Sequence, residues 1–529
     1  MRILVFHGYL LSGTGSNVYN ARLAQALVAL GHELHLLCQE RHPERCDFAG
    51  AVADWDGGQL QVRRLDRAQD AGGGSCTLYR PDIGGLLPVY VQDRYEGIQA
   101  RTFADCSDAE VAAYVRANVE AVREVVALVE PEIALANHLV MGPAILARAL
   151  EGRIPFAVKV HGSALEYTVK PQPDRFLGYA REGLEQAKTV LVGSTHTAQS
   201  LWRAMRDAAL PSRTRLGPPG VDVERFAPRD RELARVRVSE LAGALCSKDG
   251  LASEDQASAF ARDEQAAASA LDRVAQADGP LVAFVGKLIV SKGVDLLLAA
   301  WPLVLQSTPN ARLLVVGFGS YRAALEGLVD CLAAADLDGA RAIARAGRAG
   351  EADSHGSETA PLRYLLAFLD SLADAEAYTT AARAMRERIV FAGRLDHEEL
   401  AELLPLCEAL VVPSTFPEAF GMVAAEAAAC GALPVSAAHS GLAEVSETLA
   451  AAVPADARAL LSFPLGEEAV PAIADCLNGW LAVGDRLREQ TREALVAVVR
   501  ERWSWRGVAR GVVAAALGEP ESPLARAVG

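Results

Sequence analysis

The chain has 529 residues, of which 51% are apolar and 22% charged, and its formal net charge at pH 7 is −15. The apolar share supplies a sizeable core and excludes a natively disordered protein. The acidic balance argues against a nucleic-acid-binding protein and against broad adhesion to an anionic membrane, although peripheral contact through a local basic patch stays open.

Cysteine usage and hydropathy point to an intracellular compartment. The nine cysteines are scattered without a CxxC pair, which fits free thiols in a reducing compartment better than disulfides or a zinc site. No run of about 18 apolar residues occurs, so we expect no membrane span. The first apolar run, residues 3–6, is too short for a signal-peptide core, and we expect a cytoplasmic protein.

The first part of the chain alternates short apolar runs with helical spacing, which is typical of βαβ units with a parallel sheet. The predicted elements are strand 1–6, glycine-rich turn 8–16, helix 17–30, strand 33–37, helix 111–129 and strands 133–136, 156–160 and 188–192. Residues 54–79 are rich in glycine and are expected to form loop and edge structure. Glycines and prolines over 215–222 predict a domain boundary.

A second alternating region follows that boundary. Its predicted elements are strand 281–285, helix 294–305 and strands 312–316, 389–392, 409–412 and 433–435. Two Ala-rich segments, near 229–279 and 333–387, predict helical insertions. The sequence therefore predicts an α/β protein with two Rossmann-like parallel sheets facing across a cleft. The domains would span 1–222 and 223–490, with a C-terminal helix and tail over 491–529.

Three histidines, His7, His138 and His161, lie at or just past strand ends in the first domain. Ligands of open parallel sheets bind at the carboxyl ends of the strands, so this placement indicates a site. Any one of the three alone is more often a structural histidine. Without carboxylates at matched spacing, we do not interpret them as a metal site.

Two lysines stand out because the chain uses arginine for most of its positive charge. Only six of its 52 basic residues are lysine, and Lys287 and Lys292 both fall in the loop after strand 281–285. Ammonium groups there, beside a helix N-terminus, suit a diphosphate. The alternative is a solvated loop. The turn containing Gly15 could likewise admit an anion or simply be a tight βα turn.

Two glutamates flank a predicted helix start near Gly421. Glu426 would lie on an Ala-rich, buried helix and needs a partner, either the hydroxyls of a ribose or a buried arginine. Glu418 lies in the loop before the helix. With the main-chain amides of residues 420–422, it could bind sugar hydroxyls or cap the helix.

These stretches together resemble glycosyltransferase family 4, the retaining nucleotide-sugar transferases of GT-B architecture. The stretches that carry the resemblance are 13–16, 160–162, 220–228, 286–293, 390–393, 418–434 and 441–444. Their order and spacing hold over most of the chain outside the two insertions. The family commonly has arginine where Lys287 stands, which affects bidentate phosphate binding but not the charge.

The resemblance implies a role for each position. Lys287 and Lys292 would contact the donor diphosphate, and Glu426 would hold the ribose. The expected catalytic residues are His161, Glu418 and Lys292, the expected donor-binding residues are Gly15, Lys287, Lys292, Gly393, Arg394, Glu418, Phe420, Gly421, Met422 and Glu426, and the expected acceptor-side residues are His138, Tyr90, Asp93 and Tyr95. The segment 87–97, which contains the last three, is about as well explained as a plain edge strand. The final helix would cross back to the first domain.

The function implied is a metal-independent, retaining transfer of a hexose from a nucleoside-diphosphate sugar to a sugar, glycan or lipid-linked acceptor, without a bound cofactor. Two alternatives stay open: a sugar phosphorylase or nucleotide-sugar epimerase of the same architecture, and a non-catalytic nucleotide- or sugar-binding protein. A hydrolase is the least favoured class, because the sequence contains neither a Gly-x-Ser-x-Gly elbow nor a Walker motif.

Overall fold

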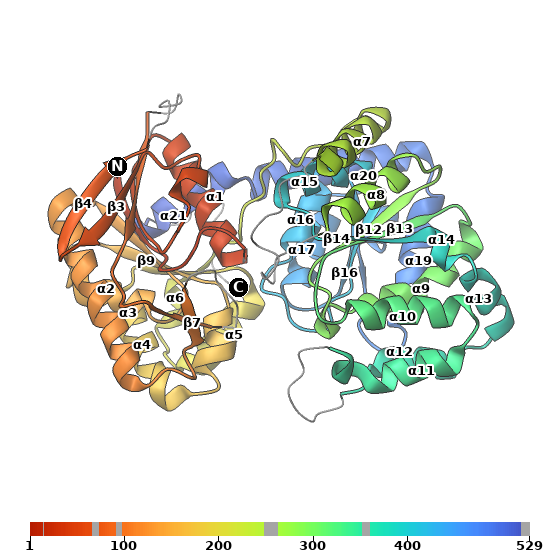
Figure 1. Cartoon of the computed structure of the whole chain (residues 1–529), viewed down its shortest axis with the longest axis horizontal. Coiled ribbons are helices and arrows are strands. Elements are labelled where there is room, and N and C mark those ends of the chain that lie inside the picture. Colours follow the sequence, from red (N-terminus) through yellow and green to blue (C-terminus); the bar gives the residue numbers. More distant parts are fainter. Residues whose placement is uncertain (14, 66–72, 91–97, 248–262, 352–359, 520–529) are drawn as a thin grey trace. The chain divides into compact units, whose positions relative to one another are not determined.

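The computed structural model describes residues 1–13, 15–65, 73–90, 98–247, 263–351 and 360–519. The chain divides into two compact units, Met1–Gly220 with Arg502–Gly529, and Val221–Glu501 (Figure 1). Each unit contains its own parallel sheet flanked by helices, so the prediction of two parallel-sheet domains is confirmed.

The first unit is built on a nine-stranded sheet. Its strands are β1 (Arg2–Phe6), β2 (Glu33–Leu37), β3 (Ala51–Asp56), β4 (Gln59–Arg64), β5 (Ser75–Arg80), β8 (Ile133–Asn137), β9 (Phe156–Val160), β10 (Thr189–Val192) and β11 (Thr214–Leu216). Their order is β11-β10-β9-β8-β1-β2-β5-β3-β4. Neighbours are parallel except for the antiparallel pair β3 and β4. Strands β6 (Leu86–Val89) and β7 (Gln99–Thr102) form a separate pair.

The segment 54–79 differs from its expected loop and edge structure. Strand β4 does lie at the edge of the sheet, but β5 lies inside it, between β2 and β3. Cys76, Leu78 and Tyr79 of β5 are buried in the core. The glycines that surround this short strand hid its apolar alternation in the sequence.

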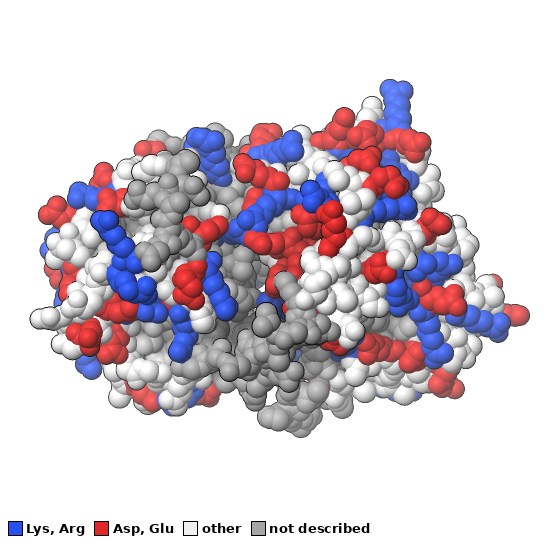
Figure 2. Space-filling model, turned by 45° about the horizontal axis from the view of Figure 1, so that its top comes forward, with Lys and Arg blue, Asp and Glu red and all other residues white. Residues whose placement is uncertain are grey.

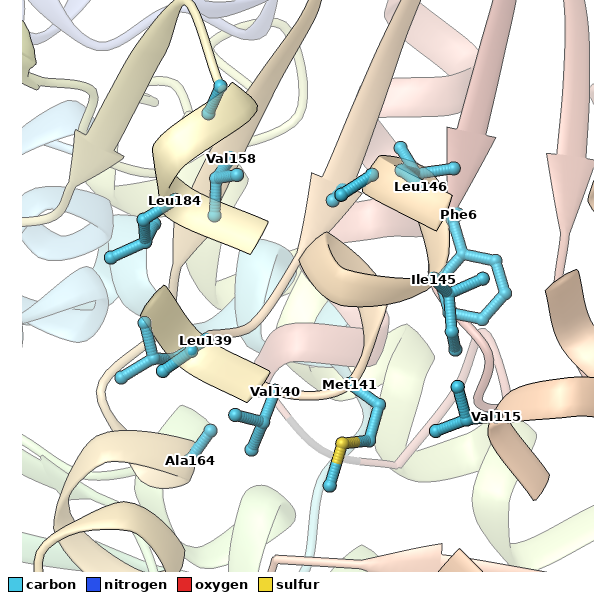
Figure 3. Close-up of a cluster of buried hydrophobic side chains, with 14 of the residues drawn as sticks. Phe6, Val115, Leu139, Val140, Met141, Ile145, Leu146, Val158, Ala164 and Leu184 are labelled. Carbon is cyan, nitrogen blue, oxygen red and sulfur yellow. The ribbon is translucent and has the colours of Figure 1, made fainter. Parts of the chain in front are cut away.

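Alternate residues of the first strand face two helical layers. The helices of this unit are α1 (Gly15–Ala29), α2 (Asp108–Val129), α3 (Gly142–Leu150), α4 (Pro173–Gln186), α5 (Thr195–Met205), α6 (Leu210–Arg213) and α21 (Trp505–Leu517). Ile3 and Val5 share a core with side chains of α1 and α21. Leu4 and Phe6 share the opposite core with α2, α3 and α4, part of which is drawn in Figure 3. The period-2 alternation of the strand thus produces a sheet covered on both faces.

The second unit contains a six-stranded, fully parallel sheet. Its strands are β12 (Leu281–Val285), β13 (Arg312–Val316), β14 (Ile389–Gly393), β15 (Ala409–Val412), β16 (Leu433–Ala437) and β17 (Ser462–Phe463), in the order β14-β13-β12-β15-β16-β17. Its helices are α7 (Arg231–Ser247), α8 (Glu264–Ala275), α9 (Val294–Ser307), α10 (Arg322–Ala333), α11 (Leu337–Ala346), α12 (Arg363–Ser371), α13 (Ala375–Ala382), α14 (Met385–Arg388), α15 (His397–Leu403), α16 (Met422–Ala429), α17 (Ser440–Ala450), α18 (Ala455–Arg458), α19 (Ala469–Ala482) and α20 (Asp485–Arg502).

Both predicted insertions are helical where they are described. The first contributes α7 and α8, which pack side by side (Figure 1). Arg231 of α7 is joined to the sheet through Glu408, a buried carboxylate that also pairs with Arg488 and Arg492 of α20. Three guanidinium groups on one carboxylate compensate its burial.

Charged side chains of both signs are mixed on the surface. On the face drawn in Figure 2, Lys and Arg side chains are interspersed with Asp and Glu, so neither sign forms a continuous charged patch there. No helix of the described residues has the length and hydropathy needed to span a bilayer. All nine cysteines are free thiols; six are buried, and Cys246 on α7 is exposed.

Candidate functional site

Main-chain segments approach one another closely at the carboxyl edge of the second unit's sheet. Gly293, in the loop after β12, has φ 65°, and a Cβ there would overlap the carbonyl oxygen of Pro413 after β15. A Cβ on Gly317, after β13, would overlap the carbonyl oxygen of Gly286 in the same way. Glycine is therefore required at both positions. The loops after three strands form one tightly packed edge.

Lys292 and Glu418 meet at this edge. The Lys292 ammonium donates to Glu418 Oε1, and the hydroxyl of Ser414 donates to the same oxygen at 2.6 Å. The two charged side chains are 30% and 25% exposed, so a ligand can reach them. The sequence analysis predicts that both residues bind the donor. The structure brings them together although 126 positions separate them.

Glu426 lies nearby in the sequence but has a different partner. It sits on α16 with only 6% of its side chain exposed, and its Oε1 lies 2.7 Å from Nε2 of His397. His397 begins α15, and its ring packs 4.8 Å from that of Phe226. The partner of this carboxylate in the described chain is thus a histidine rather than the buried arginine considered above. Within the described residues, its second oxygen makes no hydrogen bond.

Five further expected donor residues lie at the same edge. Gly421, with φ 116°, is the N-cap of α16, Phe420 is 8% exposed, and Met422 is the first residue of the helix. Gly393 ends β14, and the adjacent Arg394 pairs with Asp396 at 2.8 Å.

Lys287 follows β12 and is exposed, and it forms no ion pair within the described residues. Among the described residues, no carboxylate therefore competes with an anion for this ammonium. Lys287 and Lys292 differ in this respect, because Lys292 already has a carboxylate partner.

The carboxyl edge of the first unit gathers aromatic and imidazole rings. His138 lies at ring-centroid distances of 5.7 Å from His7, 4.9 Å from His161 and 4.6 Å from Tyr90. Three expected site residues are thereby brought together. Gly15 is the first residue of α1, with open space around its Cα. Asp93 and Tyr95 lie outside the described residues.

Burial keeps these imidazoles neutral. Desolvation lowers the pKa of His7 to about 4 and lowers the pKa values of His138 and His161 well below the ordinary value. Within the described residues, neither ring nitrogen of the buried His138 has a hydrogen-bond partner. Nε2 of His161 lies 2.9 Å from Oδ1 of Asn137 at the end of β8, so the ring donates to the amide oxygen.

Lys159 on β9 is a further basic group of the first unit whose pKa is lowered by burial. Its side chain is buried, its ammonium donates to the carbonyl of Gly217, and it lies 5.4 Å from the ring centroid of Tyr19. Burial lowers the pKa of Lys159 to about 7. The three imidazoles at the edge of the first unit are therefore neutral near pH 7, and the pKa of the buried Lys159 lies close to that pH.

Sequence reasoning missed two histidines at the edge of the second unit. His397 pairs with Glu426, and His439 hydrogen-bonds the loop that carries Glu418. Neither histidine directly follows a predicted strand, which was the signal that selected His7, His138 and His161. Within the described residues, no group of three or more His, Cys, Asp or Glu side chains is arranged to hold a metal ion.

Two family models match the chain. Residues 14–210 match the glycosyl transferase 4-like domain, and residues 373–480 match glycosyl transferases group 1. A D-inositol 3-phosphate glycosyltransferase of Mycolicibacterium vanbaalenii is 27% identical over 270 residues. That stretch is 51% of this chain and 42% of the relative, so the chain matches less than half of the relative's length.

Solved structures share the fold over nearly the whole chain. A sucrose-phosphate synthase from Thermosynechococcus elongatus covers 97% of this chain and 97% of its own at 19% identity, with a TM-score of 0.52. HepE of Anabaena, solved with UDP-glucose, covers 97% and 98% at 14% identity and a TM-score of 0.51. The catalytic domain of starch synthase IV of Arabidopsis thaliana, bound to ADP and acarbose, covers 98% of each chain at 13% identity and a TM-score of 0.54.

Proposed function

Because this chain is a GT-B glycosyltransferase of the family 4 type, we propose that it moves a sugar from a nucleoside-diphosphate sugar to an acceptor hydroxyl with retention of configuration. The observation that carries the proposal is the edge of the second unit, where the ion pair of Lys292 and Glu418 lies in a glycine-lined loop cluster. UDP-glucose in the Anabaena structure and ADP in the Arabidopsis structure support a nucleotide donor.

The charged side chains of this edge suit both the diphosphate and the sugar hydroxyls of the donor. Lys292 and the exposed Lys287 bind the diphosphate, whose negative charge grows as the bond to the sugar breaks. As Lys292 turns to phosphate oxygens, Glu418 is released to accept a hydroxyl hydrogen of the sugar. Glu426 has one oxygen on His397 and uses the other for the ribose. The lysines supply positive charge to the leaving group, and we propose that transfer needs neither a metal nor a bound cofactor.

The first unit supplies the acceptor side in this proposal. His161, His138 and Tyr90 form a neutral ring cluster, which suits a sugar ring through stacking and a hydroxyl through single hydrogen bonds. We propose a sugar, glycan or lipid-linked acceptor. Asp93 and Tyr95 stay predictions for the same surface.

A nucleotide panel followed by a transfer assay tests this function. Unfolding of the whole chain is measured with UDP, GDP and ADP; the correct nucleotide, at about 100 times its dissociation constant, should add roughly 2.7 kcal/mol to the free energy of unfolding. The nucleotide sugar of that base is then supplied with candidate acceptors, and the anomeric configuration of the product is read by NMR. Binding without transfer from any donor would favour a non-catalytic nucleotide-binding protein.

A further inference from the structure

The loop that carries Glu418 is held by two residues at the start of α17, the N-cap residue His439 and the first helical residue Ser440. The main-chain N–H of Glu418 donates to Oγ of Ser440 at 2.9 Å, and the carbonyl of Glu418 accepts from the N–H of Gly441 at 3.0 Å. Both main-chain groups of Glu418 are therefore fixed by consecutive residues. A Cβ on Gly441 would lie 2.7 Å from Cα of Phe420, so the first turn of α17 is in backbone contact with the loop that carries Glu418.

His439 completes a chain of hydrogen bonds. Its Nε2 lies 2.7 Å from the carbonyl oxygen of Ser414, which can only accept, so Nε2 carries the hydrogen. The Ser440 hydroxyl lies 3.0 Å from Nδ1 and can donate its hydrogen to that nitrogen. Ser440 thus has its hydroxyl hydrogen directed at His439 and its oxygen directed at Glu418.

This arrangement keeps Ser440 in an unfavourable backbone conformation. Its φ is 52°, in the left-handed region that a residue with a Cβ adopts at a cost and glycine adopts readily. Serine differs from glycine at this position by its hydroxyl group. Here the hydroxyl is hydrogen-bonded both to the main-chain N–H of Glu418 and to Nδ1 of His439.

We propose that Ser440, oriented by His439, is a positioning residue for Glu418 in sugar transfer. The inference rests on the proposed function, in which Glu418 binds the transferred sugar. The Oγ contact fixes the main chain of Glu418, while Ser414 and Lys292 direct its carboxylate. Losing the hydroxyl lets the carboxylate drift from the sugar without affecting the lysines that hold the diphosphate.

The test separates stability from activity. Ser440→Gly removes the hydroxyl and relieves the backbone, so we expect an unchanged or higher Tm together with a kcat/KM for the nucleotide sugar at least tenfold below wild type. The Kd for the free nucleoside diphosphate should stay within twofold. Ser440→Ala should lose the same activity without the gain in Tm. Ser440→Thr, which keeps a hydroxyl on a β-branched residue, should recover most of the activity at a lower Tm.

Ala335 offers a matched control in the same unit. Its φ is 60°, and its side chain is an exposed methyl group. Ala335→Gly should raise the Tm as Ser440→Gly does and leave kcat/KM unchanged. Wild-type kcat/KM in Ser440→Gly would overturn the proposal, as would a fall in Tm that accompanies the loss of activity in all three variants. A wild-type protein that transfers no sugar from any donor would instead refute the proposed function.

Discussion

The carboxyl edges of the two sheets are both built from loops that follow parallel strands, but one edge carries neutral rings and the other carries charged side chains. In the first unit, His7 and His161, whose pKa values are lowered by desolvation, lie beside His138, whose ring nitrogens have no hydrogen-bond partner within the described residues. In the second unit, an ion pair of Lys292 and Glu418 stands partly exposed among glycine loops. The strands of both sheets are similar apolar runs. The residues just after the strands therefore decide which edge is neutral and which is charged.

The neutral edge should be the more acid-sensitive of the two. Because the pKa of His7 is about 4 in the folded state and about 6.5 in the unfolded state, the unfolded chain binds a proton between these pH values that the native chain does not. The contribution of His7 to the free energy of unfolding is therefore complete above pH 6.5 and is lost as the pH falls. At pH 4 this loss amounts to about 3 kcal/mol for His7 alone. Urea unfolding at several pH values measures this loss.

His7→Gln is the matched variant for the acid effect. It should unfold with a shallower pH dependence than wild type, because one buried imidazole no longer takes up a proton on unfolding. The lowered pKa values of His138 and His161 act in the same direction and should leave a residual slope. An identical slope in wild type and variant would mean that the edge is already protonated or open to water in the native state.

The charged edge should be the more sensitive in catalysis. Lys292→Ala removes the ammonium that we place on the leaving diphosphate, and kcat should fall about a hundredfold. Steady-state kinetics with the true donor measures the effect. Lys188→Ala, at an exposed lysine just before β10, is the control and should leave kcat unchanged. Equal rates for Lys292→Ala and wild type would remove Lys292 from the mechanism.

His397→Ala should affect both stability and nucleotide affinity. It leaves the Glu426 carboxylate buried without its histidine, which should lower the free energy of unfolding by about 2 kcal/mol. Binding of the nucleoside diphosphate should weaken with it, because the carboxylate that we propose for the ribose loses the histidine that orients it. His42→Ala, at an exposed histidine paired with Glu44, should change stability by less than about 0.5 kcal/mol. Unaltered affinity in His397→Ala would separate this pair from the nucleotide.

Lys287→Ala should have the smallest effect. The side chain is exposed and without an ion pair in the described part of the chain, so stability should stay within about 0.5 kcal/mol of wild type. The donor KM should rise by roughly three- to tenfold, consistent with a loss of about 1 kcal/mol in binding. Lys287→Arg keeps the charge and should recover most of the affinity. No recovery would show that the ammonium's size matters and not only its charge.

Much of the fold could be predicted because buried parallel strands are continuous apolar runs bounded by glycine. The predicted strands 33–37, 156–160, 281–285, 312–316 and 409–412 have the same bounds in the structure. Strand β5 was missed because glycine-rich neighbours obscure a short alternation.

The site was harder to predict, because its pairs are made by the fold. The sequence identified Glu418 and Lys292 separately but could not show that they bond to each other across 126 positions. It missed His397 and His439 because a histidine's partner is set by the loops that pack around it, not by local spacing. The roles of these residues in transfer stay predictions.

Uneven burial of the thiols makes Cys246 a ready attachment point for a reporter dye. Burial raises the pKa values of Cys38, Cys407 and Cys476, which keeps them protonated and slow to react, whereas Cys246 stands exposed on α7. A maleimide fluorophore should therefore attach there first in the native protein. The first insertion could then be followed by fluorescence while nucleotide is added, without removing any other cysteine.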